Sequence, residues 1–60
     1  MPKPETIKQL IGQDVTVHCV GGGRTRGHLL NANRRSLWLV AGDEDRFIPL
    51  VSVAQLRAAG

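Results

Sequence analysis

Apolar and polar residues alternate along several short segments of this sequence, and turn-forming residues separate these segments at intervals of roughly ten residues. The alternation is clearest in DVTVHCV and in SLWLVA. A period of two places successive side chains on opposite faces of a β-strand. The pattern therefore predicts four strands, at residues 14–20, 24–32, 36–41 and 46–53.

The alternation also predicts which side chains face the core. Val15, Val17 and Cys19 fall on one face of the first strand, so Cys19 is expected to be a buried, unreactive thiol. In the third strand, Leu37 and Leu39 share one face. These two faces are expected to meet in a common apolar core.

Three clusters of turn-forming residues separate the predicted strands. Gly21–Gly23 can adopt positive φ without strain. NANRR at 31–35 has two asparagines, which tolerate left-handed geometry, and GDED at 42–45 is polar throughout. Short turns between alternating segments are typical of antiparallel strands.

Three features leave details of the sheet open. Gly27, inside the second strand, predicts either a bulge or a tight bend. Pro49 cannot donate to a strand ladder, so it predicts an edge strand or a bulge. The segment AQLRAA at 54–59 fits a short fifth strand or a frayed tail.

Residues 3–12, KPETIKQLIG, have the pattern of a short helix. Pro4 suits the first helical position, and Ile7, Leu10 and Ile11 form one apolar face at helical spacing. A helix of about two turns is not stable alone, so it is expected to lie against the sheet.

These elements predict an all-β fold, a small SH3-like antiparallel barrel of four to five strands with a short N-terminal helix. We expect a single domain over residues 1–60, with the barrel at 14–58.

A chain of 60 residues has little core, because folding buries only about 60% of the surface of so short a chain. The single cysteine, Cys19, excludes an intramolecular disulfide. His18, Cys19 and His28 lack the spacing of a zinc site, so no metal or other cofactor is expected. Self-association through strand edges is the expected source of added stability.

The beginning of the chain, MPKPETIKQL, lacks the apolar core of a signal peptide, and no apolar run is long enough to span a membrane. One free cysteine fits a reducing compartment. These features predict a cytoplasmic protein without a membrane partner.

Positive charge is concentrated in the middle of the chain. Residues 15–42 contain four arginines and no acidic residue, whereas the net charge of the whole chain is +3. Guanidinium groups bind phosphate through paired hydrogen bonds, which favours a nucleic-acid surface. Alternatively, the arginines only keep a small barrel soluble. Arg24 and Arg26 share a strand face while Arg34 and Arg35 lie in a turn, so two patches are expected rather than one.

Two further side chains have an open role. His28 shares a face with Leu30, where it contacts nucleic acid or is partly packed. Trp38 could stack on a base, but a lone Trp in a small domain is more often part of the core or of a subunit interface. Catalysis has no support, because no Ser/His/Asp or Cys/His arrangement has suitable spacing. We expect no enzyme and no small-molecule substrate.

The segments IGQDVTVHCVGGGRTRGHLL, SLWLV and FIPLVSV resemble, in this order, the strands of the Sm-like (LSm) family in its bacterial form. Gly27-His28-Leu29 matches the family's glycine, any residue, aliphatic pattern in the second strand. The resemblance implies a ring in which the fourth strand of one subunit pairs with the fifth of the next. It also implies RNA binding around the pore, with Asn33 in the position of the family's base-holding polar residue. The family's second motif near the last turn is absent, because this chain has PLVSV there.

The sequence therefore predicts a non-enzymatic, homo-oligomeric protein that binds nucleic acid, and RNA in the first place. The alternative is a protein-interaction or structural assembly module of SH3-like fold without a nucleic-acid role. The expected nucleic-acid-binding residues are Arg24, Arg26, His28, Asn31, Asn33, Arg34 and Arg35.

Overall fold

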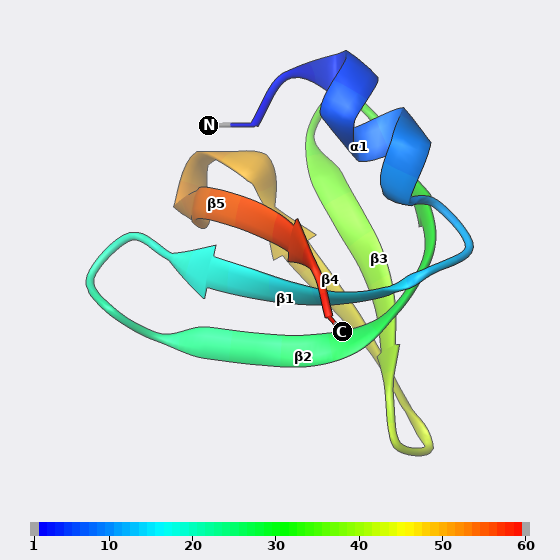
Figure 1. Cartoon of the computed structure of the whole chain (residues 1–60). Helices are drawn as coiled ribbons and strands as arrows, with labels where there is room; N and C mark the ends of the chain where they lie inside the picture. Colours follow the sequence, from blue (N-terminus) through cyan, green and yellow to red (C-terminus); the bar gives the residue numbers. More distant parts are fainter. Residues whose placement is uncertain (1, 60) are drawn as a thin grey trace.

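The structure, a computed structural model, describes residues 2–59. Its elements are α1 (Pro4–Leu10), β1 (Asp14–Cys19), β2 (Arg24–Ala32), β3 (Ser36–Ala41), β4 (Glu44–Pro49), the 3₁₀ turn η1 (Leu50–Ser52) and β5 (Val53–Ala58). The five strands form one antiparallel sheet in the order β4-β3-β2-β1-β5, which curls around the core with α1 at one end (Figure 1). The predicted small antiparallel barrel with a short N-terminal helix is confirmed.

The helix α1 is shorter than the predicted 3–12 because the chain leaves it to join β2. Gly12 has a φ of 90°, and its N–H donates to the Leu29 carbonyl at 2.7 Å. The Leu29 N–H in turn donates to the Gln13 carbonyl at 2.9 Å. These two bonds fix the end of the helix against the sheet, with Ile7 buried beneath it.

The long strand β2 bends so that it serves two neighbours. It pairs with β1 through residues 24–28 and with β3 through residues 28–32, so His28 is the one position common to both ladders. Gly27 pairs regularly with Val15, and the bulge lies at Leu30, where the register with β3 shifts. Of the two options for Gly27, the structure shows a bend with close backbone approach.

The three predicted turns are present. The first predicted strand, 14–20, is wrong at Val20, which belongs to the glycine turn because β1 ends at Cys19, and the other two turns are shorter than expected. Gly21 and Gly22 have φ values of 96° and 101°, which confirms the glycine turn between β1 and β2. The predicted turn over 31–35 is wrong at its first two residues, which belong to β2. The predicted turn over 42–45 is wrong at its last two, because Ala41 pairs with Glu44 and leaves a two-residue turn.

The predicted fourth strand over 46–53 is wrong in its second half. Strand β4 ends at Pro49, and the chain turns through η1 before β5 begins at Val53. Leu50 is buried there, and its N–H donates to the Arg35 carbonyl at 2.7 Å. Pro49 lies on an edge strand, as predicted, and the undecided segment 54–59 supplies most of β5.

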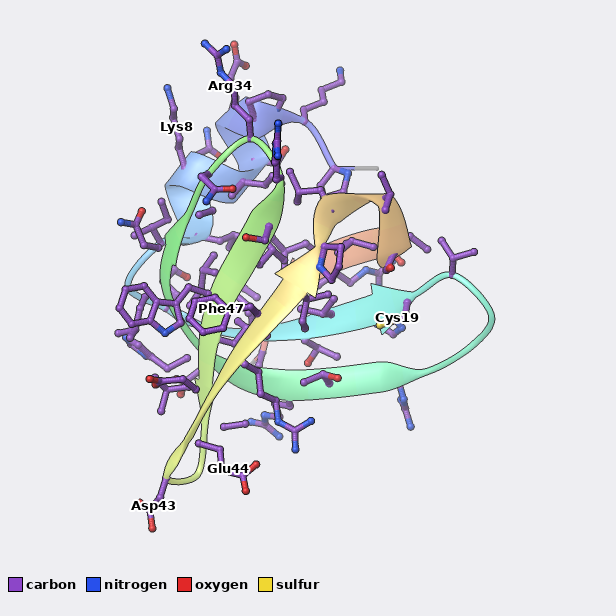
Figure 2. The ribbon with its side chains drawn as sticks, turned by 180° about the vertical axis from the view of Figure 1, so that it is seen from behind. Lys8, Cys19, Arg34, Asp43, Glu44 and Phe47 are labelled. Carbon is purple, nitrogen blue, oxygen red and sulfur yellow. The ribbon has the colours of Figure 1, made fainter. Side chains whose placement is uncertain are left out.

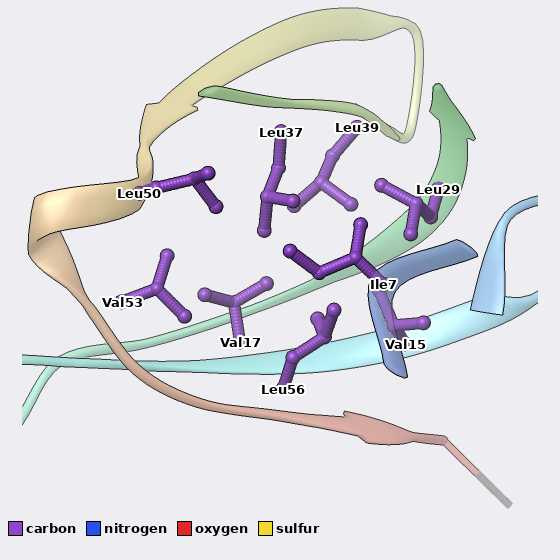
Figure 3. Packing of buried hydrophobic residues seen from close by; sticks show 9 residues of the cluster. All are labelled: Ile7, Val15, Val17, Leu29, Leu37, Leu39, Leu50, Val53 and Leu56. Atoms are coloured by element: carbon purple, nitrogen blue, oxygen red, sulfur yellow. The ribbon is translucent and has the colours of Figure 1, made fainter. Parts of the chain in front are cut away.

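The core fills the inside of the curled sheet (Figure 3). All buried side chains among residues 2–59 are aliphatic: Ile7, Val15, Val17, Leu29, Leu37, Leu39, Leu50, Val53 and Leu56. The predicted inward faces of the first and third strands are therefore confirmed, with one exception. Cys19 is only half-buried, because the β1–β5 register shifts at the end of β1 beside the glycine turn.

Candidate nucleic-acid interface

The outer face of β1 lies between two rows of long polar side chains. Because Val15 and Val17 point into the core, Thr16 and His18 point outward. Thr16 pairs with Arg26 on one neighbouring strand and with Arg57 on the other. Side chains that are directly opposite in a ladder lie on the same face. Two arginines from distant parts of the chain therefore flank Thr16 on the outside of the sheet.

The next row along β1 adds a third arginine. His18 pairs with Arg24 on β2 and with Gln55 on β5. We call this surface of β1, β2 and β5 the arginine face; it consists of Thr16, His18, Arg24, Arg26 and Arg57. Together with Ala58 and Ala59, these residues line an open depression of about 470 Å³.

A neighbouring amide orients one of these arginines. The amide of Gln55 is best oriented with its oxygen toward Arg57. In this orientation, Gln55 Oε1 accepts hydrogen bonds from Arg57 Nε at 2.9 Å and from Arg57 Nη2 at 3.0 Å. A guanidinium group has five N–H donors, so most of those of Arg57 stay free for another acceptor.

The positive charge of the arginine face is not neutralised within the chain. Among residues 2–59 the ion pairs are His28–Asp14, at 3.0 Å, and Arg46–Glu44, at 3.6 Å. Arg24, Arg26 and Arg57 have no carboxylate partner in this part of the chain. Unpaired guanidinium groups on an open surface suit the phosphates of a polyanion.

His28, a predicted contact residue, lies beside an acid. Its Nδ1 is 3.0 Å from Asp14 Oδ1, and both side chains are largely exposed. The pair follows directly from the register, in which Asp14 is opposite His28. The carboxylate makes this end of the outer face less favourable for phosphate than the arginine face.

The second predicted group lies in the loop between β2 and β3. Asn33 Oδ1 accepts hydrogen bonds from the N–H groups of Arg35, at 2.7 Å, and of Ser36, at 2.9 Å. This is a turn-forming use of asparagine, and it engages the side-chain oxygen within the loop. Asn31, at the end of β2, likewise accepts from the Ala32 N–H at 2.8 Å.

Arg34 lies apart from Arg24 and Arg26. It borders a cavity of about 390 Å³ between α1 and the β2–β3 loop, where Lys8 is also present (Figure 2). Ile7, Ile11 and Leu50 form the apolar wall of this cavity. Arg24 and Arg26 therefore lie together at one hollow. Arg34 lies at a different one.

Sequence reasoning missed Arg57 and did not include His18 among the expected binding residues. Alternation alone places Arg57 opposite the buried Leu56, on the outside of β5. The position of Arg57 on this face could be predicted only if residues 54–59 were known to form a strand beside β1, and the sequence leaves that open. Trp38 is not part of the core, because it lies on the outer face, where it is 38% exposed; its roles in stacking on a base or at a subunit interface stay predictions.

Two other classes of site have no support in the structure. No group of three or more His, Cys, Asp and Glu side chains within residues 2–59 is placed to hold a metal ion. Over the same residues, no helix has both the length and the apolar character needed to cross a membrane.

No family model matches this sequence, and no curated protein matches it. The fold, in contrast, is similar to a crystal structure of the pleiotropic translational regulator Hfq, with a TM-score of 0.81. The similarity covers 88% of this chain and 92% of that chain, at 13% sequence identity. The chain therefore has an Sm-like fold, and the resemblance in the order of the strands is confirmed at the level of the fold.

Proposed function

We propose that this chain is a non-enzymatic RNA-binding protein that holds the RNA backbone on its arginine face. The single observation behind the proposal is the convergence of Arg24, Arg26 and Arg57 on one open surface without a carboxylate partner among residues 2–59. Phosphate contacts supply most of the affinity in sequence-independent binding, and arginine is well suited to them.

The width of the face allows contact with more than one phosphate. Arg26 and Arg57 are separated by Thr16, and hence by two interstrand spacings, or about 10 Å, between their backbones. Their long side chains can therefore reach different phosphates of one RNA strand. The similarity in fold to a translational regulator supports RNA as the polyanion.

The proposal includes assembly of several copies. Strands β4 and β5 are the two edges of the sheet, and each has one side without a strand partner among residues 2–59. Unpaired edges are favourable sites for pairing with another chain. Pairing of β4 with β5 of the next copy would satisfy both edges and repeat the arginine face around the assembly. We place the protein in the cytoplasm, which the free Cys19 supports.

A protein-interaction or structural module remains the second candidate, and exposed apolar side chains favour it. Val51 is 77% exposed, Val20 67% and Phe47 64%. Val20 and Ser52 are joined by a backbone hydrogen bond of 2.8 Å, which brings the glycine turn close to η1. Apolar side chains on exposed edges are typical of surfaces that bind other proteins.

Fluorescence anisotropy with a labelled single-stranded RNA of about ten nucleotides tests the proposed function. Two exposed charge contacts are worth about 2 kcal/mol in water, so Arg26→Ala with Arg57→Ala should weaken binding roughly thirtyfold. Arg46→Ala is the matched control, because it removes a positive charge that is already paired with Glu44. Equal affinities for the double variant and for the wild type would exclude the arginine face as the RNA site.

A further inference from the structure

The cavity between α1 and the β2–β3 loop has the size and the lining of a small-molecule site. Its volume of about 390 Å³ lies within the range of ligand pockets in proteins. It shares no lining residue with the arginine face. We call it the helix cavity. Most of its wall is apolar, and the apolar lining residues are Pro2, Pro4, Ile7, Ile11, Ala32 and Leu50.

Hydrogen bonds hold both sides of the helix cavity in place. On the helix side, the Gly12 N–H donates to the Leu29 carbonyl at 2.7 Å and fixes the end of α1. On the loop side, Asn33 Oδ1 accepts from the Arg35 N–H at 2.7 Å, and the Leu50 N–H donates to the Arg35 carbonyl at 2.7 Å. The cavity is therefore formed before any ligand enters, which lowers the cost of binding.

The lining favours an aliphatic occupant over a flat ring. Ile7 and Leu50 are 6% and 7% exposed, so the floor of the helix cavity is continuous with the core. None of the residues among 2–59 that line it is aromatic, whereas Trp38 and Phe47 border a different hollow. A nucleobase depends on an aromatic surface for stacking, and the helix cavity offers none. An alkyl chain gains from apolar contact alone.

Two cationic side chains lie at the opening of the helix cavity. Lys8 comes from the last turn of α1 and Arg34 from the β2–β3 loop, and both are exposed (Figure 2). Neither forms an ion pair among residues 2–59. Glu5, the acidic residue of α1, is not among the lining residues. An anionic head group at this opening would accept charge-assisted hydrogen bonds from an ammonium and a guanidinium group.

We infer that the helix cavity binds a small aliphatic carboxylate, with its alkyl chain on the apolar floor and its carboxylate between Lys8 and Arg34. The inference goes beyond the proposed function and does not depend on it, because the arginine face is a separate surface. The lining residues within 2–59 include no His, Cys, Ser, Asp or Glu. The carboxylate is therefore a ligand and not a substrate.

An NMR titration of the backbone amides with octanoate tests this inference. The amides of Ile11, Ala32 and Arg34 should shift, while those of Arg26 and Arg57 on the arginine face should not. Octanoate should bind about fifteenfold more tightly than hexanoate, because it buries two more methylene groups. Octan-1-ol has a chain of the same length without the charge, so it should bind about 2- to 30-fold more weakly than octanoate.

Variants of the two cations test the position of the carboxylate. Lys8→Gln with Arg34→Gln should weaken octanoate binding by about 2- to 30-fold and leave octan-1-ol binding unchanged. Both side chains are exposed, so the double variant should fold like the wild type. Arg46→Gln is the matched control, because it removes a cation that is paired with Glu44 and does not line the cavity.

Each contrary outcome overturns the inference. Absence of shifts at about 10 mM octanoate, tenfold above a millimolar Kd, would show that the cavity takes no such ligand. Equal affinities for hexanoate and octanoate would show that the alkyl chain is not buried. Equal octanoate affinities for the double variant and for Arg46→Gln would show that the two cations do not hold the carboxylate. RNA binding is measured separately, so the proposed function and this inference can fail independently.

Discussion

Gly27 lies so close to Val40 that a Cβ atom on the glycine would be 2.8 Å from the Val40 carbonyl oxygen and 3.2 Å from its carbonyl carbon. Both neighbours are backbone atoms of β3, so they cannot turn away as a flexible side chain could. Gly27 comes directly before His28, where β2 passes from the ladder with β1 to the ladder with β3. The sheet can curl at this point because the residue has no side chain.

We predict that Gly27→Ala destabilises the protein by about 1–3 kcal/mol, the usual cost of forcing atoms into a packed site. Gly23→Ala is the matched control, because a Cβ there would meet only Cys19 Cβ at an ordinary 3.8 Å. It should be neutral, or stabilising by a few tenths of a kcal/mol through the unfolded chain. Urea unfolding at one fixed protein concentration measures both, and equal midpoints would contradict the close approach.

Asn33 gives a second stability prediction. Asn33→Ala removes two hydrogen bonds to the N–H groups of Arg35 and Ser36, so it should cost about 1–2 kcal/mol. Asn33→Asp keeps an oxygen in the same place and should retain most of the wild-type stability. If thermal unfolding finds Asn33→Ala as stable as Asn33→Asp, the side chain does not hold the loop.

Much of the fold could be predicted because the core follows simple alternation. Val15, Val17, Leu37 and Leu39 are the inward positions of period-two segments, and all four are fully buried. The segment after Pro49 could not be predicted in the same way. FIPLVSV is apolar almost without interruption, so nothing in the sequence marks where β4 ends and η1 begins. The break is a tertiary effect, in which Leu50 turns into the core.

The candidate site could be predicted only in part, because it depends on which strands are neighbours. Arg24 and Arg26 share a face by alternation within one strand, and this was visible in the sequence. Arg57 joins them only because β5 pairs with β1, across more than thirty intervening residues. Hydrogen bonding is equally hidden, since the sequence gives no sign that Asn33 uses its oxygen within the loop.

Substitutions of Cys19, the last residue of β1, test whether its side chain is partly buried. Its side chain packs against the core without being enclosed, so Cys19→Ser should cost less than about 1 kcal/mol. Cys19→Asp places a charge beside the apolar cluster and should cost about 1–3 kcal/mol or more. Chemical denaturation of the reduced proteins measures both. A Cys19→Asp protein as stable as Cys19→Ser would show that the position is open to solvent.

Assembly through the sheet edges predicts a defined oligomer and not a monomer. Native mass spectrometry of protein purified without nuclease treatment gives the number of copies and any co-purified RNA in one experiment. The Arg26→Ala, Arg57→Ala variant should keep the wild-type copy number, because these side chains project from the outer face of the sheet, whereas pairing of β4 with β5 uses backbone groups. It should lose the co-purified RNA. A monomer at micromolar concentration would contradict pairing of β4 with β5.

Salt dependence distinguishes RNA binding from the alternative of a protein-interaction module. Each phosphate that is neutralised on a single strand releases about 0.7 counterion, so three arginines predict a slope of about −2 in log affinity against log salt. Arg57→Ala should make this slope shallower by about 0.7, while Arg46→Ala should leave it unchanged, since Glu44 already pairs with Arg46. A partner bound through Val20, Val51 and Phe47 would instead show nearly constant affinity as salt rises, and that result would favour the protein-interaction module.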